Sequence, residues 1–337
     1  MGKKYIITAA ACIVAVIAIV AFYLFAPMAA GGETKYVFID DDDNIDSVYT
    51  KLKPLSHSYS MTTFSTLSRQ MGYDKHIRTG RYAVEPGTSA LTTFRRFRNG
   101  QQSPISLTIP SVRTIDRLAE EVGKRLMLNS DSLLAALQDE AICEKYGLDT
   151  LTIQCLFIPN TYDIYWNVSV EKFLDRMNKE RKAFWTEGRV SQAKDAGMTP
   201  EEVVTMASIV DEETANDEEK PMVAGMYINR LKAGMPLQAD PTVKYALKNF
   251  ALKRIYHDML MVNSPFNTYR NIGLPPGPIR IPTVAGIEAV LNHIEHEYMY
   301  MCAKEDFSGT HNFAKTYAEH LQNAAKYSAA LNKRGIK

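Results

Sequence analysis

The sequence predicts an α+β protein with one membrane-spanning helix near its N-terminus. Tyr5 to Met28 are all apolar or small residues without a charge. The rest of the chain mixes segments of helical periodicity with short β-type runs. These segments do not follow the regular β-α-β order that a parallel sheet with crossover helices would need, which favours an α+β class.

The apolar segment is long enough to cross a membrane, because about 20 apolar residues in a helix span a bilayer core of ~30 Å. Lys3 and Lys4 precede it and favour a cytoplasmic stub of residues 1–4. Its length favours a signal anchor over a cleaved signal peptide. The small residues 29–31 leave cleavage open, but either way the chain after about Glu33 is expected outside the cytoplasm.

Composition narrows the range of partners and of redox chemistry. The chain has 337 residues, with 39 basic and 38 acidic residues and a net charge of +1. This balance gives no electrostatic footprint for nucleic acid, and the length allows two or three compact units. Of the four cysteines, Cys12 lies inside the apolar segment. Cys143, Cys155 and Cys302 show no paired spacing typical of a metal cluster, and one disulfide among these three stays open.

After a short tether at Gly31–Thr34, the first stretch predicts small helices between short strands. The expected elements are a strand at 36–39, a helix from Ile45, a short helix around Phe64, a strand at 81–84, a helix at 89–98 and a strand at 105–109.

The remainder predicts mainly helices. The expected segments are helices at 111–128, 130–140 and 170–187, a rigid loop at 157–162, a helix from Thr199 to about Asn216, helices at 218–232 and 284–292, a strand at 298–303 and a helix from Ala314. Thr199-Pro-Glu-Glu202 is a strong helix start, because Thr199 can cap, Pro200 suits the first turn and Glu202 completes a capping box.

The end of that helix carries the main candidate for chemistry. Residues 206–214 read MASIVDEET, and the helical spacing places Glu213 on the same apolar face as Val203 and Val210. Asp211 and Glu212 are expected to rotate away toward solvent.

A carboxyl group on an apolar face at a helix C-terminus has two reasons to retain its proton, namely desolvation and the negative end of the dipole. Such a group suits general-acid catalysis at a glycosidic oxygen. The alternative is that Glu213 only forms a salt bridge with Arg230 or Lys232 at the helix end.

Polar clusters follow at 229–231, 237–242 and 264–269. Amides mixed with aromatic rings suit a sugar-binding cleft, and they equally suit loops that cap their own backbone. His293 and His296 lack the spacing of a zinc signature, and GxSxG, GxxxxGK and GxGxxG motifs are absent from the sequence. Cys302 and His311 could form a nucleophile pair, but the sequence offers no support for this beyond the presence of the two residues. We therefore expect no metal and no cofactor.

Four blocks in order resemble a known family. They are TMASIVDEET, MYINRLKAGMPLQADPTVKYAL, SPFNTYRNIGLPPGPI and GTHNFAKTYAEH. Together they resemble the endolytic murein transglycosylases of the MltG (YceG-like) family. The resemblance is strong over Thr205–His320 and weaker over Tyr36–Pro110, where that family carries a LysM-like subdomain.

The resemblance implies a catalytic glutamate at Glu213 and lytic cleavage of the β-1,4 bond between N-acetylmuramic acid and N-acetylglucosamine. The muramyl C6 hydroxyl then attacks its own anomeric carbon and leaves a 1,6-anhydro end. It also implies that a set of side chains binds glycan or orients Glu213. This set is Asn229, Gln238, Asp240, Asn267 and Tyr269.

The sequence departs from the family pattern at several places. Asp211 replaces the first acid of the family element and Glu212 replaces a lysine, so the local charge is more negative, which we expect to raise the pKa of Glu213 further. Asn160 replaces an acid in the loop FIPNTY, and PSVRT replaces a glycine-containing turn.

The resulting expectation is a membrane-anchored transglycosylase that terminates glycan elongation. Residues 5–28 would be the anchor, 36–109 a LysM-like subdomain, 110–198 a helical linking part and 199–337 the catalytic domain. Expected partners are peptidoglycan strands, the membrane and peptidoglycan synthases (penicillin-binding proteins), but not nucleic acid. The catalytic domain would be extracytoplasmic, and periplasmic where an outer membrane exists. The alternative is a non-catalytic peptidoglycan-binding scaffold, which would be expected to lose Glu213.

Overall fold

The computed structural model of the chain describes residues 2–252 and 254–335. It forms two compact units. The first comprises residues up to Leu107 with Lys124–Leu128 and Tyr162–Ser169, and the second contains the other described residues. The break after Leu107 lies beside the boundary expected at 109, whereas the further division at 198 stays a prediction.

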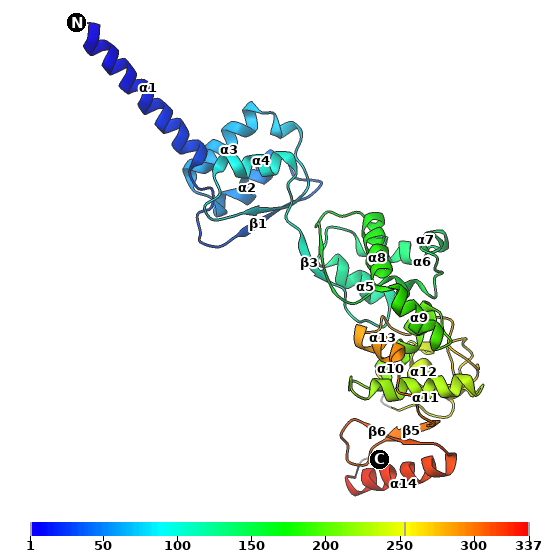
Figure 1. Cartoon of the computed structure of the whole chain (residues 1–337). Coiled ribbons are helices and arrows are strands. Elements are labelled where there is room, and N and C mark those ends of the chain that lie inside the picture. The colour runs from blue at the N-terminus through cyan, green and yellow to red at the C-terminus, as the bar shows by residue number, and fades with distance from the viewer. Residues whose placement is uncertain (1, 253, 336–337) are drawn as a thin grey trace. The chain divides into compact units, whose positions relative to one another are not determined.

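The first unit places helices around a two-stranded antiparallel sheet (Figure 1). Its elements are α1 (Gly2–Phe25), β1 (Lys35–Ile39), α2 (Ile45–Leu52), α3 (Ser58–Gln70), β2 (Gly80–Val84) and α4 (Ala90–Asn99), with 3₁₀ turns at Lys53–Leu55 and Tyr73–Lys75. In the register, Lys35 lies opposite Val84 and Ile39 opposite Gly80.

Aromatic rings fill the core of this unit. Phe64 of α3 meets Phe94, Phe97 and Tyr73 edge to face, with ring centroids 5.5–6.3 Å apart. None of these four rings is more than 1% exposed. Edge-to-face contacts contribute beyond the burial of apolar area, so Phe64 joins α3 to α4.

The chain directly after α1 is also part of that core. Met28 is fully buried, its backbone N–H donates to Thr88 O at 2.8 Å, and its carbonyl accepts from His57 N–H at 3.0 Å. Ala29 forms an isolated antiparallel bridge with Ser56. The helix therefore ends at Phe25, and Met28, which we expected in the apolar segment, lies in the folded unit instead.

The second unit consists mainly of helices, with one hairpin of strands near its C-terminus. Its elements are α5 (Ile115–Gly123), α6 (Ser130–Gln138), α7 (Glu140–Lys145), α8 (Val170–Phe184), α9 (Glu187–Asp195), α10 (Pro200–Glu213), α11 (Lys220–Lys232), α12 (Asp240–Ala246), α13 (Val284–Leu291), β5 (Tyr300–Ala303), β6 (His311–Ala314) and α14 (Tyr317–Lys333), with 3₁₀ turns at Ile153–Leu156 and Met259–Met261. β3 (Ile105–Thr108) pairs with β4 (Thr161–Ile164) where the chain passes between the units.

Helix α10 is the central element of this unit. Thr199 and Glu202 form the expected capping box at its start, and Pro200 occupies the first turn. Every residue from Val203 to Val210 is buried, and α13 and α11 pack against it. A helix buried all round is held by tertiary packing rather than by propensity, so its C-terminal end has a fixed position.

Several expected boundaries are wrong. The helix expected over 111–128 covers only Ile115–Gly123, because residues 111–113 are used in contacts with Arg280 and Glu212. The helix from Thr199 ends at Glu213 rather than near Asn216.

Several further elements were not predicted at all or only in part, among them the short helices α7 and α9. The loop expected at 157–162 runs into β4, and β6 precedes the last helix, which begins at Tyr317. The segment expected as loop after Gly234 contains α12, since Asp240 and Pro241 make a favourable helix start. The α+β class itself is confirmed.

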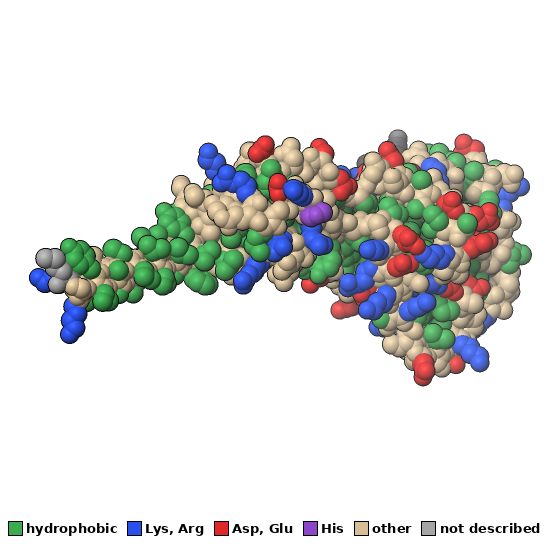
Figure 2. All heavy atoms as spheres, turned by 90° about the horizontal axis from the view of Figure 1, so that it is seen from above, with side chains coloured by type: hydrophobic (Ala, Val, Ile, Leu, Met, Phe, Trp, Pro, Cys, Tyr) green, Lys and Arg blue, Asp and Glu red, His purple; other side chains and the backbone are tan. Residues whose placement is uncertain are grey.

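One helix, α1, is long and apolar enough to cross a membrane. None of its residues is classed as buried, and hydrophobic side chains cover it in the view of Figure 2.

We expect Met28→Ala to destabilise the first unit by about 2–5 kcal/mol, because it opens a cavity in a closed core. Phe25→Ala is the matched control, since Phe25 is 66% exposed and three residues away. The measurement is denaturant unfolding of the full chain in detergent, followed by Trp166 fluorescence in a Trp185→Phe background. Equal effects of the two substitutions would show that Met28 does not belong to the core.

Candidate active site

Glu213 is the last residue of α10, and its carboxyl group is held by the next helix. The Tyr227 hydroxyl of α11 donates to Glu213 Oε1 at 2.5 Å, and Tyr227 is 2% exposed. Glu213 itself keeps partial exposure. The bond engages one carboxyl oxygen, and Oε2 has no hydrogen-bond partner among the residues that the structure describes. Glu213 forms no ion pair with Arg230 or Lys232 there, so the salt-bridge alternative is wrong.

The surroundings raise the pKa of Glu213 from 4.5 to about 7. The main cause is removal of the carboxyl group from water, and the negative charge of Asp240 adds to it. The hydrogen bond from Tyr227 and the charges of His311 and Lys244 act in the opposite direction. Near neutral pH the group therefore exists in both forms, which suits an acid that must also accept a proton.

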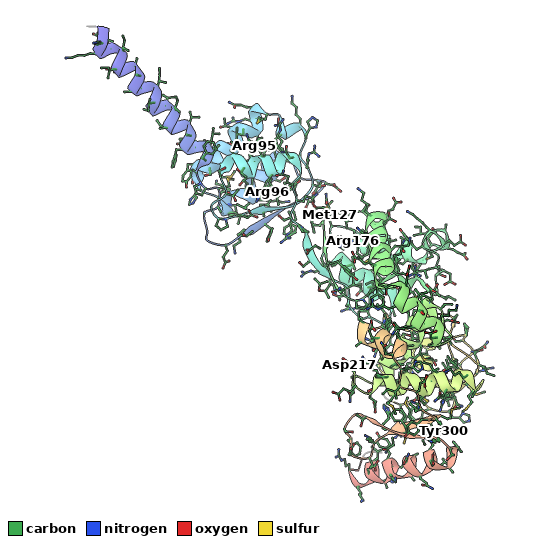
Figure 3. All side chains as sticks on the ribbon, in the orientation of Figure 1. Arg95, Arg96, Met127, Arg176, Asp217 and Tyr300 are labelled. Carbon is green, nitrogen blue, oxygen red and sulfur yellow. The ribbon has the colours of Figure 1, made fainter. Side chains whose placement is uncertain are left out.

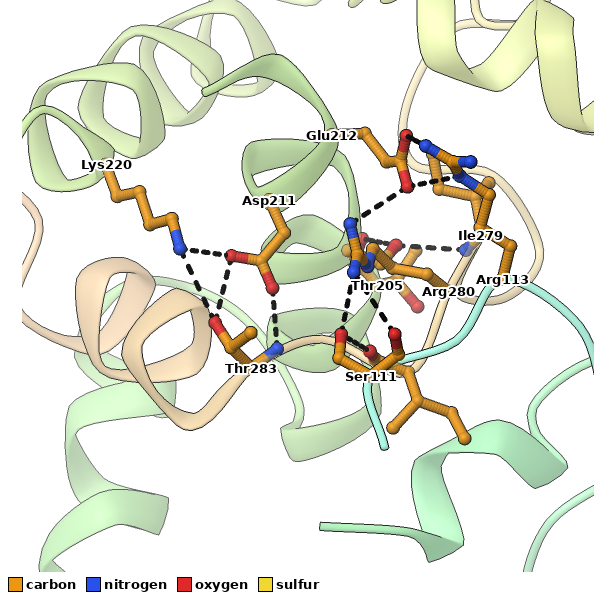
Figure 4. Close-up of polar contacts among 11 residues, drawn as sticks. Ser111, Arg113, Thr205, Asp211, Glu212, Lys220, Ile279, Arg280 and Thr283 are labelled. Atoms are coloured by element: carbon orange, nitrogen blue, oxygen red, sulfur yellow. Dashed lines mark hydrogen bonds and ion pairs between the residues drawn. The ribbon is translucent and has the colours of Figure 1, made fainter. Parts of the chain in front are cut away.

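The two preceding acids are not exposed, contrary to our expectation. The side chain of Asp211 is 2% exposed and lies 2.7 Å from Lys220 Nζ (Figure 4). It also accepts hydrogen bonds from the backbone N–H and the hydroxyl of Thr283, the N-cap of α13. Asp211 lies so close to Gly286 that a Cβ there would be 2.5 Å from its Oδ1.

Glu212 is paired in the same way on the other side. Arg113 Nε lies 2.7 Å and Arg280 Nη1 lies 3.0 Å from Glu212 Oε1, and the Glu212 side chain is 10% exposed. Arg280 also donates to Ser111 Oγ at 2.9 Å. Cations pair with both acids, and neither acid is among the main causes of the raised pKa of Glu213, which are burial and the charge of Asp240.

These contacts hold the last turn of α10 to four other parts of the second unit. Asp211 ties it to α11 and α13, and Glu212 ties it to the segment before α5 and to Arg280. The contacts of Asp211 and Glu212 therefore fix the end of α10, and with it the position of Glu213.

Two loops run together beside the site. The backbone N–H of Gln238 donates to Thr268 O at 3.1 Å, and the hydroxyls of Thr242 and Thr268 are 2.8 Å apart. Gln238 has a φ of 49°, a left-handed conformation, and it is exposed. The Tyr269 hydroxyl donates to Asp240 Oδ1 at 2.6 Å, and burial with this bond raises the pKa of Tyr269.

The side-chain amides of Asn229 and Asn267 donate hydrogen bonds to backbone carbonyls. Asn229 Nδ2 donates to His296 O at 2.7 Å and to Tyr298 O at 3.0 Å. Asn267 is fully buried, and its Nδ2 donates to Leu260 O and Val262 O at 2.9 Å each. In the structure both amides hold loops in place. Asp240, at the start of α12, and Tyr269 are close enough to Glu213 to interact with it electrostatically, and Gln238 is exposed.

A histidine and a second glutamate also belong to this region. His311 Nδ1 lies 2.9 Å from Glu219 Oε2, and its backbone N–H donates to Glu219 Oε1. The sequence suggested His311 only as the partner of Cys302 in a nucleophile pair and as part of the block GTHNFAKTYAEH. It gave no signal for Glu219 as its partner or for Tyr227 as the donor to Glu213, because these contacts join residues 14 and 92 positions apart.

No cluster of three or more metal-ligating side chains occurs among residues 2–252 and 254–335. His293 and His296 each contact a backbone carbonyl through a ring nitrogen, and the four cysteines are free thiols.

Glu213 is a half-buried carboxylic acid with a pKa near neutrality, and loops rich in polar and aromatic side chains lie beside it. These are the properties of a site for general-acid catalysis. The chain belongs to the YceG-like family, whose sequence profile matches residues 37–326.

Curated relatives include an endolytic murein transglycosylase of Streptococcus pneumoniae, 27% identical over 87% of this chain and 58% of its own length. Another from Bacillus subtilis is 28% identical over 77% of this chain and 75% of its own length. This chain thus spans little more than half of the pneumococcal relative. A crystal structure of a yceG-like protein from Listeria monocytogenes superposes with a TM-score of 0.57 at 26% identity, covering 87% of this chain and 99% of that one.

We expect Asp211→Asn to destabilise the second unit by about 3 kcal/mol, because it leaves Lys220, only 6% exposed, without its buried counter-charge. Asp217→Asn is the matched control. Asp217 also lies 2.7 Å from Lys220 Nζ, but it is 69% exposed in the turn before α11 (Figure 3). Its loss is expected to cost under about 1 kcal/mol. Unfolding followed by Trp185 fluorescence in a Trp166→Phe background measures both, and similar losses would contradict the assignment.

Proposed function

We propose that the protein is a lytic transglycosylase that cleaves the β-1,4 bond between N-acetylmuramic acid and N-acetylglucosamine in peptidoglycan. The observation that carries this proposal is Glu213, one carboxylic acid with a pKa of about 7 at the end of a rigid buried helix. The relatives named endolytic murein transglycosylases support the choice of substrate.

In the proposed reaction, Glu213 donates its proton to the glycosidic oxygen as the bond to the anomeric carbon breaks. The resulting carboxylate then takes the proton of the muramyl C6 hydroxyl, whose oxygen forms the new bond to the same carbon. The products are a 1,6-anhydro end and a free 4-hydroxyl, with no water consumed. Hydrolytic glycosidases need a second carboxylate as nucleophile or to activate water, and an internal hydroxyl removes that need.

The side chains near Glu213 then have different parts. Gln238, Asp240 and Tyr269 are proposed to contact the glycan. Asn229 and Asn267 are proposed to act indirectly, since they hold the backbone of the neighbouring segments. Tyr227 orients the carboxyl group and lowers its pKa against the effect of burial.

We further propose that α1 anchors the protein in the cytoplasmic membrane with both units outside the cytoplasm. Residues 36–109 would act as a LysM-like part, for which the helix pair between two antiparallel strands is the structural support. Beside a peptidoglycan synthase, such an enzyme would cut nascent strands and end their elongation.

Glu213→Gln is expected to lower cleavage of peptidoglycan by at least about 10³-fold, because the amide cannot donate the required proton. The assay incubates full-length wild type and variant in detergent with peptidoglycan and identifies the chain ends by mass spectrometry. Reducing ends instead of anhydro ends would exclude the lytic route. A wild type that binds peptidoglycan without cutting it would favour the scaffold.

Tyr227→Phe is expected to move the basic limb of the activity–pH profile upward by roughly half to one pH unit. The hydroxyl stabilises the carboxylate, so its loss raises the pKa of Glu213 above about 7 and keeps the acid protonated to higher pH. A profile that stays in place or moves down would contradict this role. Tyr59→Phe, in the first unit, is a control that should leave the profile unchanged.

A further inference from the structure

The exposed aromatic rings of α1 mark two levels along the helix. Tyr5 lies near its start, and Phe22, Tyr23 and Phe25 lie at its end, all between 41% and 70% exposed. Their separation of about 17–20 residues corresponds to roughly 26–30 Å, which is close to the thickness of a bilayer core. Aromatic residues gather at both interfaces of a membrane, so the outer interface falls at Phe22–Phe25.

Helix α3 meets α1 at this same level. The ring of Tyr59 lies 5.5 Å from that of Phe22, and the Thr63 hydroxyl donates to Tyr23 O at 3.1 Å. Because the chain after Phe25 is built into the core of the first unit, no flexible linker separates this unit from the helix. The position of α3 relative to α1 is therefore fixed.

Between the two helices lies a notch of about 310 Å³ with a largely apolar wall. The lining residues of α1 are Ile19, Val20, Tyr23 and Leu24, and those of α3 are Thr62, Thr63, Thr66, Leu67 and Gln70. Ile19 and Val20 precede the aromatic level, so the notch extends from the interface toward the apolar core of the bilayer.

We propose that this notch binds a membrane phospholipid and that α3 lies in the headgroup layer. The acyl chain would pack against Ile19 and Val20 of α1 and Leu67 of α3. The hydroxyls of Thr62 and Thr66 line the same notch. An interfacial helix with one polar and one apolar side occupies this depth in a membrane.

Arg69 supplies the charge for the headgroup. It follows Thr62 by seven residues, or two helical turns, and so lies on the same side of α3. It is exposed, and its Nε makes a long 3.4 Å contact to Ser65 O. A guanidinium at this position is suited to a lipid phosphate, and a cation near an anionic surface strengthens binding to it.

The proposal rests on the membrane anchoring proposed above, and the test separates the two. The full-length chain carries the photoreactive residue p-benzoylphenylalanine in place of Thr66 and is placed in vesicles of phosphatidylglycerol and phosphatidylethanolamine. Illumination followed by mass spectrometry detects attached phospholipid. We expect efficient attachment at Thr66.

Two positions serve as controls. The same residue in place of Ile13, in the middle of α1, reports on membrane insertion. In place of Phe38, which is 39% exposed, it reports on non-specific labelling, because its neighbours Val37 and Ile39 are the β1 side chains that point into the core containing Phe64.

Attachment at Ile13 and Thr66 but not at Phe38 supports the notch. Attachment at Ile13 alone overturns it and leaves the anchor standing, whereas failure at Ile13 overturns both. Equal attachment at Thr66 and Phe38 also overturns it.

The role of Arg69 is tested in the Thr66-labelled chain. Arg69→Gln is expected to lower the share of phosphatidylglycerol among attached lipids about fivefold, and Arg69→Lys, which keeps the charge, should restore most of it. An unchanged share in Arg69→Gln would overturn the assignment of the headgroup to this side chain.

Discussion

The second unit is organised by one constraint, a carboxyl group kept largely out of water at the end of α10. An ionised carboxylate is costly to bury, so the group either finds a cation or holds its proton. Here the cations pair with the two acids that precede Glu213. Lys220 pairs with Asp211, and Arg113 and Arg280 pair with Glu212. Glu213 receives only a neutral hydroxyl donor. Of the three adjacent acids, two are paired with cations, and the third is left with a raised pKa.

Local patterns predicted the elements that depend on local physics. The capping box at Thr199 and Glu202 and the apolar face that contains Glu213 both depend on the regular spacing of residues along one helix. Both could be predicted because the spacing of residues along a helix determines the face on which each side chain lies. The position of Glu213 was accordingly the most secure part of the candidate site.

Contacts between distant segments could not be predicted in the same way. Helical periodicity correctly placed Asp211 and Glu212 on other faces of α10 than Val203 and Val210. Because α10 is packed on all sides, these faces contact other elements instead of water. The cations that pair with these two acids are up to 99 positions away in the sequence. For the same reason the sequence of the polar loops did not show what each side chain contacts. Asn267, expected to bind glycan or to orient Glu213, is fully buried, and its amide donates to the backbone carbonyls of Leu260 and Val262.

The segment between α1 and β1 carries a consequence for biogenesis. Met28 and Ala29 are made within the first tenth of the chain, yet they pair with Thr88 and Ser56 and complete a core that also needs Phe94 and Phe97. That core cannot close while residues 26–30 are held in an insertion channel with the apolar helix. With α1 as the membrane anchor proposed above, folding of the first unit would wait until this helix has entered the lipid, and completion of the unit would be coupled to membrane insertion.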